Sequence, residues 1–91
     1  MDISVDIKTG IQEAFKALYN HEIEGDSINL QPTRKEFNGS HTFVTFPFAR
    51  ISKKNPVQTG EEIGTFLVEK TDWLKGFNVV KGFLNLELAD N

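Results

Sequence analysis

Two side chains near the C-terminus, Phe83 and Asn85, have the types and spacing needed to hold a flat polar ring. A phenylalanine ring can stack on a nucleobase, and a carboxamide can donate and accept hydrogen bonds at a base edge. Residues two apart share one face of a strand, so both side chains are expected to face out of the sheet. Leu84, Leu86 and Leu88 alternate with them and predict a core face on the other side. A structural alternative is that Phe83 packs under a loop and Asn85 caps a turn.

A short basic cluster could supply phosphate contacts to such a ligand. It consists of Arg50, Lys53 and Lys54, and its alternative is an ordinary solvated helix face. The net charge of −3 argues against a free-standing, non-specific nucleic-acid binder, because phosphate contacts need a basic surface. It leaves room for a local contact made by a few basic residues.

Sequence signatures of catalysis are missing. There is no cysteine, no GxxxxGK[ST] phosphate loop and no GxGxxG fingerprint. His21 and His41 lie at unrelated places, so no metal site is expected, and no spacing suggests a Ser-His-Asp triad. We therefore expect a binding or accessory module with no catalytic residues of its own.

The elements that must position Phe83 and Asn85 follow from periodicity and turn signals. Ninety-one residues predict a single domain, 1–91. The order α-β-β-(short α)-α-β-β predicts an α+β fold of two layers, with helices on one face of a four-stranded antiparallel sheet. The predicted helices span 3–20 and 56–70, and the predicted strands span 26–31, 40–46, 76–81 and 83–88.

Local signals refine the middle of the chain. Asn55 can cap a helix whose first residue is Pro56, although Thr59 with Glu62 also fits a capping box and a later start. A short helix is expected from Pro47. Gly60 and Gly64, four apart, are expected to let the 56–70 helix approach the sheet closely.

The expected location of the protein follows from two features that the sequence lacks. No apolar run approaches the roughly 20 residues of a membrane span, and residues 1–4 do not resemble the start of a signal peptide. We expect a soluble, cytoplasmic protein without membrane contacts.

Three blocks of the sequence resemble the N-terminal additional domain of arginyl-tRNA synthetase, in the form found in Bacteroidetes. The family shows a Gly-Asp turn, an Asn-Pro helix start and a Gly-Pro-Gly-Phe-[Ile/Leu]-Asn-Phe strand. The corresponding residues are Gly39-Ser40, Asn55-Pro56 and the stretch 80–86, in the same order and at similar intervals. Two positions depart from the pattern, because Ser40 replaces Asp and Lys81 replaces Pro.

The resemblance implies an αββαββ module that docks on the D loop of arginine tRNA. The aromatic and amide residues of the family strand, which touch a D-loop base, fall on Phe83 and Asn85. Lys81 would add a cation near the RNA, with Arg50, Lys53 and Lys54 as further phosphate contacts. The parent enzyme would use ATP and supply the catalytic domain as a second partner, while this domain would hold no cofactor. The rival hypothesis is a non-enzymatic protein-interaction domain that uses an exposed strand at 83–88.

Overall fold

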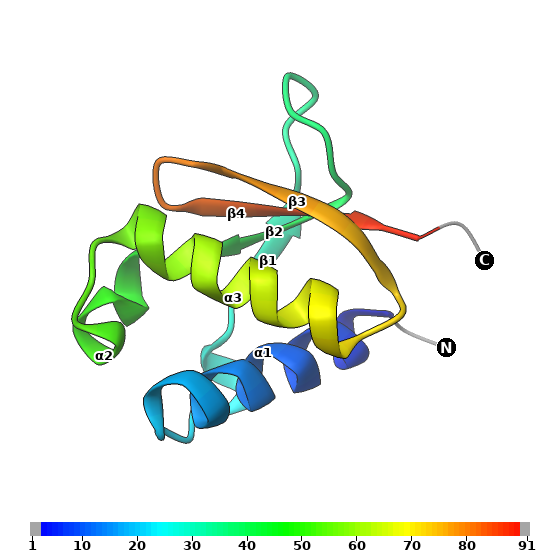
Figure 1. Ribbon diagram of the computed structural model, residues 1–91. Coiled ribbons are helices and arrows are strands. Elements are labelled where there is room, and N and C mark those ends of the chain that lie inside the picture. The colour runs from blue at the N-terminus through cyan, green and yellow to red at the C-terminus, as the bar shows by residue number, and fades with distance from the viewer. Residues whose placement is uncertain (1–2, 90–91) are drawn as a thin grey trace.

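The computed structural model describes residues 3–89 and contains a helical layer beneath a four-stranded antiparallel sheet (Figure 1). The sheet order is β1-β2-β4-β3, so β4 lies between two neighbours. The α+β prediction with helices on one face is confirmed. In chain order the elements are α1 (Ile3–Tyr19), η1 (Gly25–Ser27), β1 (Leu30–Pro32), β2 (His41–Val44), η2 (Phe46–Phe48), α2 (Ala49–Ser52), α3 (Pro56–Lys70), β3 (Leu74–Val80) and β4 (Phe83–Leu88).

The strand predicted at 26–31 is wrong at its start. Residues 25–27 form a turn of 3-10 helix, because the Ser27 backbone N–H and hydroxyl both donate to the Glu24 carbonyl, at 3.0 and 2.6 Å. A local serine-to-backbone hydrogen bond competes with strand pairing in this way. Ile28 is nevertheless buried in the core, which explains why its alternation with polar neighbours suggested a strand.

Helix α3 begins where the Asn-Pro signal places it. The Asn55 side chain accepts a hydrogen bond from the Gln58 backbone N–H at 2.8 Å, and Pro56 occupies the first turn. Thr59 therefore does not cap a helix that begins later in the chain. It is fully buried, and its hydroxyl lies 2.6 Å from the Ser52 hydroxyl, joining α3 to α2. The predicted short helix after Pro47 is present as η2 followed by α2.

The predicted close approach of α3 to the sheet is confirmed at both glycines. A Cβ on Gly64 would lie 2.6 Å from the ring of Phe77, and one on Gly60 would lie 3.2 Å from Val79. Phe77 and Val79 are therefore on the helix-covered face. Their partners across β4, Leu86 and Leu84, are fully buried on that same face.

Aromatic rings from both layers fill the core. Phe15 of α1 packs against Phe43 of β2 and Phe48 of η2, with ring centroids 6.4 and 5.2 Å apart. On α1, a stripe of side chains is fully buried, formed by Ile7, Ile11, Ala14 and Phe15, whereas Leu18 is 42% exposed. Leu18 follows Phe15 by three residues, at the rim where α1 leaves the core.

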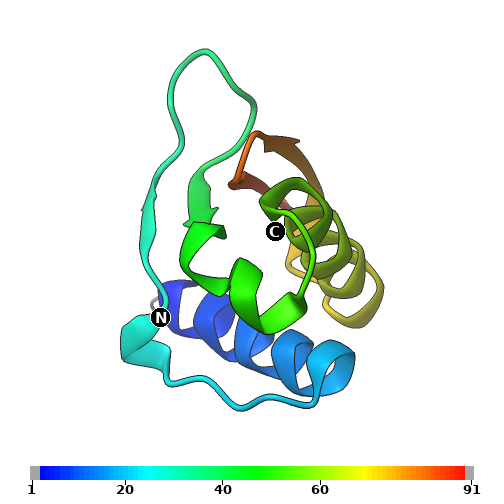
Figure 2. The ribbon, with the colours of Figure 1, turned by 90° about the vertical axis from the view of Figure 1, so that its left-hand side faces the viewer.

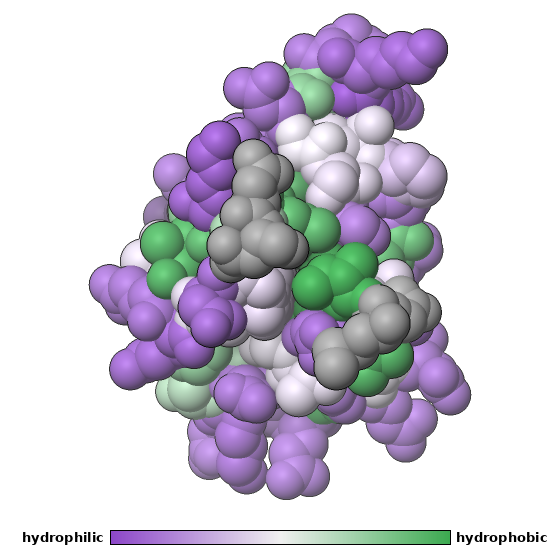
Figure 3. Space-filling model, turned by 90° about the vertical axis from the view of Figure 1, so that its right-hand side faces the viewer, coloured by the Kyte–Doolittle hydropathy of each residue, from purple (hydrophilic) through white to green (hydrophobic). Residues whose placement is uncertain are grey.

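The β1–β2 loop, residues 33–40, rises on the side of the sheet away from α1 (Figures 1 and 2). Within residues 3–89, no helix is both long and apolar enough to cross a membrane. The start of α1 and the end of β4 lie at the end of the molecule opposite the β3–β4 turn (Figure 1). That end is mostly hydrophilic on its surface, with a small apolar area near the middle of the view (Figure 3).

Candidate nucleic-acid interface

A row of polar side chains crosses the sheet face that the helices leave open. The strand register places Thr42 of β2 and Asn78 of β3 on either side of Asn85 of β4. Asn85 accepts a hydrogen bond from the Thr42 hydroxyl at 2.6 Å and donates one to the Asn78 carboxamide oxygen at 2.9 Å. The Thr42 hydroxyl also lies 2.9 Å from that of Thr33. The sequence prediction that Asn85 faces away from the core leucines is therefore correct in direction.

The expectation that Asn85 is exposed and stands apart from the packed interior is wrong. Asn85 is only 2% exposed, because the β1–β2 loop folds down over it. Gly39 of this loop has a φ of +139°, and a Cβ there would lie 3.4 Å from the Asn85 Cβ. Asn78 ties the loop down by donating to the Asn38 carbonyl at 2.7 Å. Asn85 is thus part of a second, polar interior on the open face.

Phe83 lies on the same face and is half-buried. Its ring meets that of Phe46 edge to face, with centroids 5.6 Å apart and planes at 79°. Phe83 and Asn85 both line a cavity of about 190 Å³ between the sheet and the β1–β2 loop. This volume is below the roughly 300–1,000 Å³ typical of sites for drug-sized ligands, so the cavity suits a single flat group. Its remaining lining residues are Gln31, Pro32, Arg34, Phe37, Thr42, Val80 and Lys81.

Two cavity residues, Arg34 and Phe37, were missed by sequence reasoning. Both come from the β1–β2 loop, where the Phe37 backbone N–H donates to the Arg34 carbonyl at 3.0 Å and closes a turn. Arg34 is exposed and Phe37 is half-buried. The sequence does contain a pattern that could have indicated both residues. Arg34 and Phe37 are a basic and an aromatic residue three positions apart, just before the turn signal at residues 38–40.

Lys81 stands at the mouth of this cavity, in the two-residue turn between β3 and β4. It is exposed, and its φ is +58°. Proline is held near −65°, so the family's proline could not adopt the backbone conformation that lysine adopts here. The departure from the family pattern therefore changes the turn as well as the charge.

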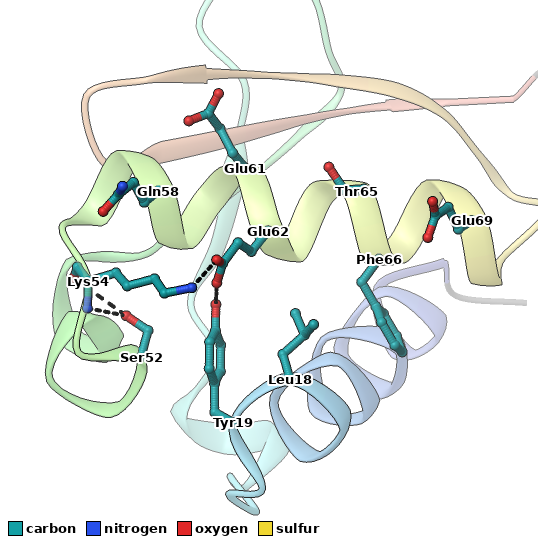
Figure 4. Close-up of a pocket in the computed structure, with 10 residues that line it drawn as sticks. All are labelled: Leu18, Tyr19, Ser52, Lys54, Gln58, Glu61, Glu62, Thr65, Phe66 and Glu69. Atoms are coloured by element: carbon teal, nitrogen blue, oxygen red, sulfur yellow. Dashed lines mark hydrogen bonds and ion pairs between the residues drawn. The ribbon is translucent and has the colours of Figure 1, made fainter.

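The three residues of the predicted basic cluster differ in their ion pairing. Arg50 and Lys53 are exposed, and neither takes part in an ion pair within residues 3–89. Lys54 instead pairs with Glu62 of α3, on the helix side of the molecule (Figure 4). Among the three predicted basic residues, Lys54 is therefore the one whose ammonium group already has a carboxylate partner.

A larger hollow lies between α1 and α3, where Glu62 also accepts a hydrogen bond from the Tyr19 hydroxyl at 2.7 Å (Figure 4). The Lys54 hydrogen bond lowers the pKa of Glu62, and the Tyr19 bond adds to this effect. Burial, followed by the Glu62 carboxylate, raises the pKa of Tyr19 above its ordinary value. Glu61 and Glu69 also line this hollow, so it is poorly suited to a polyanion. No group of three or more potential metal ligands occurs among the described residues.

Known proteins resemble this chain over nearly its whole length. Residues 5–88 match the family model described as the arginyl tRNA synthetase N terminal domain. The chain is 45% identical over 92 aligned residues to the arginine–tRNA ligase of Phocaeicola vulgatus and 44% identical over 89 to that of Bacteroides fragilis. These alignments cover 100% and 98% of this chain but only 15% of each relative.

A solved structure supports the same fold. The arginyl-tRNA synthetase of Thermus thermophilus superimposes with a TM-score of 0.78 at 18% identity, over 97% of this chain and 14% of that one. The family model covers nearly every residue, and the identities to the ligases exceed 40%. The chain therefore belongs to the family of arginyl-tRNA synthetase N-terminal domains.

Proposed function

We propose that this chain is the tRNA-binding accessory domain of an arginine–tRNA ligase and docks on the D loop of arginine tRNA. The observation that carries the proposal is the cavity on the open face, which gathers Phe83, Asn85 and Lys81 with Arg34 and Phe37. Family membership supplies the ligand class, and the cavity supplies a place for one base. Attachment of arginine with ATP would be the work of the rest of a longer cytoplasmic enzyme, whose catalytic domain is the second partner.

The side chains of the cavity suit an unstacked base. The Phe83 ring offers an apolar surface for stacking, which is worth roughly 1–3 kcal/mol per base. A carboxamide has two N–H groups and an oxygen with two lone pairs. Asn85 uses one lone pair to accept from Thr42 and one N–H to donate to Asn78. One lone pair and one N–H therefore remain for a base edge. Its internal hydrogen bonds fix the orientation of the amide before the ligand arrives, which lowers the entropic cost of binding.

Charge is distributed in a way that favours RNA on this side. The net charge is −3, yet residues 30–53 contain four basic side chains and a single acidic one. Lys81 adds a further cation at the cavity mouth. In this proposal Arg34 and Lys81, which line the cavity, contact phosphates that flank the bound base. Arg50 and Lys53, both exposed, are further candidates for phosphate contacts. Lys54, already paired, has no part in this proposal.

A protein-interaction domain built on an exposed strand 83–88 is disfavoured by the sheet order. Strand addition requires a free edge, and β4 is paired with β2 on one side and β3 on the other. Its backbone hydrogen-bonding groups are already engaged within the sheet.

The test is Phe83→Ala in the full-length enzyme, with aminoacylation measured while tRNA, arginine and ATP are varied in turn. We expect the KM for tRNA to rise about tenfold, consistent with the loss of one stacked base, and the KM values for arginine and ATP to stay unchanged. Phe66→Ala is the matched control, because Phe66 is also half-buried but lines the hollow between α1 and α3. An unchanged KM for tRNA in a folded Phe83→Ala enzyme would refute the proposal.

A further inference from the structure

Phe46 is an aromatic side chain that does not line the cavity. It is 50% exposed, and it is the only aromatic residue among the large exposed hydrophobic residues of the described chain. It is the first residue of η2, two residues after the end of β2, and its ring lies edge to face with that of Phe83. Phe46 is not part of the cavity lining, so it extends the aromatic surface beyond the cavity rather than closing it.

The Phe46 ring is held in place by the β3–β4 turn. A Cβ on Gly82 would lie 2.7 Å from this ring, so only glycine lets the ring rest on the turn. The neighbouring Thr45 fastens the same turn, because its backbone N–H and hydroxyl both donate to the Gly82 carbonyl, at 2.9 and 2.7 Å. Thr45 is fully buried. The exposed ring is therefore supported by a rigid base, which is what a stacking platform requires.

Two basic residues, Lys81 and Arg50, lie in segments next to Phe46. Lys81 precedes Gly82 in the turn beneath Phe46, and it is exposed. Arg50 lies in α2, four residues after Phe46, and it is exposed. Neither cation belongs to an ion pair within residues 3–89. An exposed aromatic ring with unpaired cations nearby has the chemistry of a single-stranded nucleic-acid contact.

We propose that Phe46 stacks on a second nucleobase of the same RNA loop, next to the base held by Phe83 and Asn85. This inference rests on the proposed function and adds a second recognition position to it. The planes of Phe46 and Phe83 meet at 79°, so two bases stacked on them cannot also stack on each other. The bound segment is therefore a loop with splayed nucleotides, as in sequence-specific single-stranded RNA recognition. Its backbone passes over the β3–β4 turn toward Arg50.

The test uses three variants of the full-length enzyme, Phe46→Ala, Phe46→Leu and Phe46→Trp, and measures the Kd for an arginine tRNA transcript at fixed salt concentration. Leucine keeps apolar contact with Gly82 and Phe83 but removes the flat ring. We expect about tenfold weaker binding for alanine and leucine alike, and binding at least as tight as the original for tryptophan. Leu18→Ala is the control, since Leu18 is 42% exposed on the α1 side and should leave the Kd unchanged.

Three results would overturn the inference. If the leucine variant binds tRNA like the original enzyme, Phe46 acts only by packing. If no Phe46 variant changes the Kd while Phe83→Ala does, Phe46 is not a contact and the proposed function stands. If Phe46→Ala leaves the Kd unchanged but lowers the thermal unfolding temperature of the full-length enzyme and not of this chain alone, Phe46 contacts another part of the protein. If Phe83→Ala also leaves the Kd unchanged, the proposed function itself is refuted.

Discussion

The two faces of the sheet exclude water by different means. Leu86 and Asn85 are neighbours in β4 with nearly the same exposure, 0% and 2%, but they point to opposite faces. Leu86 is covered by helices and apolar side chains. Asn85 is covered by a loop and held by hydrogen bonds to Thr42 and Asn78. The helix-covered face is a conventional core, whereas the open face combines a buried polar network with a cavity. A single strand thus contributes side chains both to the apolar core and to the cavity that we propose as the recognition site.

The largest effect is expected on the helix-covered face. Leu86→Ala removes a fully buried side chain and leaves a cavity beneath α3. Substitutions of this kind cost about 2–5 kcal/mol, so the free energy of unfolding in urea should fall by that amount. Val68→Ala, at a residue 38% exposed on α3, is the control and should change it little. A loss below that of Asn85→Ala would show that the apolar face is not the dominant one.

A smaller loss of stability is expected from the open face. Asn85→Ala leaves the buried Thr42 hydroxyl with only the Thr33 hydroxyl as a partner, and it leaves the Asn78 carboxamide oxygen without its donor. Leaving buried polar groups unpaired costs roughly 1–3 kcal/mol. In urea unfolding, the loss of unfolding free energy for Asn85→Ala should therefore be smaller than for Leu86→Ala and larger than for Asn78→Ala. Asn78 is only half-buried. No loss at all would mean that the polar row does not stabilise the fold. For this reason Asn85 is a less clean probe of RNA binding than Phe83.

The smallest effect is expected from the polar contact on the helix side, between Tyr19 and Glu62. Tyr19→Phe removes one partly buried hydrogen bond, and at neutral pH we expect a loss below about 1 kcal/mol. The folded-state pKa of Tyr19 is raised, so its contribution is complete below the ordinary value near 10 and is lost as the pH rises above it. The pKa of Glu62 is lowered, so its contribution is present at neutral pH and is lost as the pH falls through the folded-state value.

The titration of this contact can be followed directly. Tyr19 is the only tyrosine of the chain, so phenolate absorbance reports on it alone. We expect ionisation to be delayed in the folded chain relative to the unfolded chain, and the decline of stability at alkaline pH to become less steep in Tyr19→Phe. Equal titration of folded and unfolded chains would contradict the contact.

Signals confined to neighbouring residues were predicted well from the sequence. The start of α3 depends on Asn55 and Pro56, which act within one helical turn. The closeness of α3 to the sheet followed from Gly60 and Gly64. The strand 83–88 was correct in bounds and in the direction of its leucines, since alternation is a property of the strand backbone. The failure at Ser27 shows the limit of such signals, because a side-chain hydrogen bond made a turn where alternation suggested a strand.

Sequence alone therefore determined the α+β class, the helix and strand order, the family and the side of the sheet on which Phe83 and Asn85 lie, because these depend on periodicity and short-range capping. Only the tertiary structure decided that the 33–40 loop covers Asn85, that Arg34 and Phe37 join the cavity and that Lys54 pairs with Glu62. Each of these contacts joins residues from different elements. Local patterns do not specify such partners, because the distance between two elements is set by packing of the whole chain.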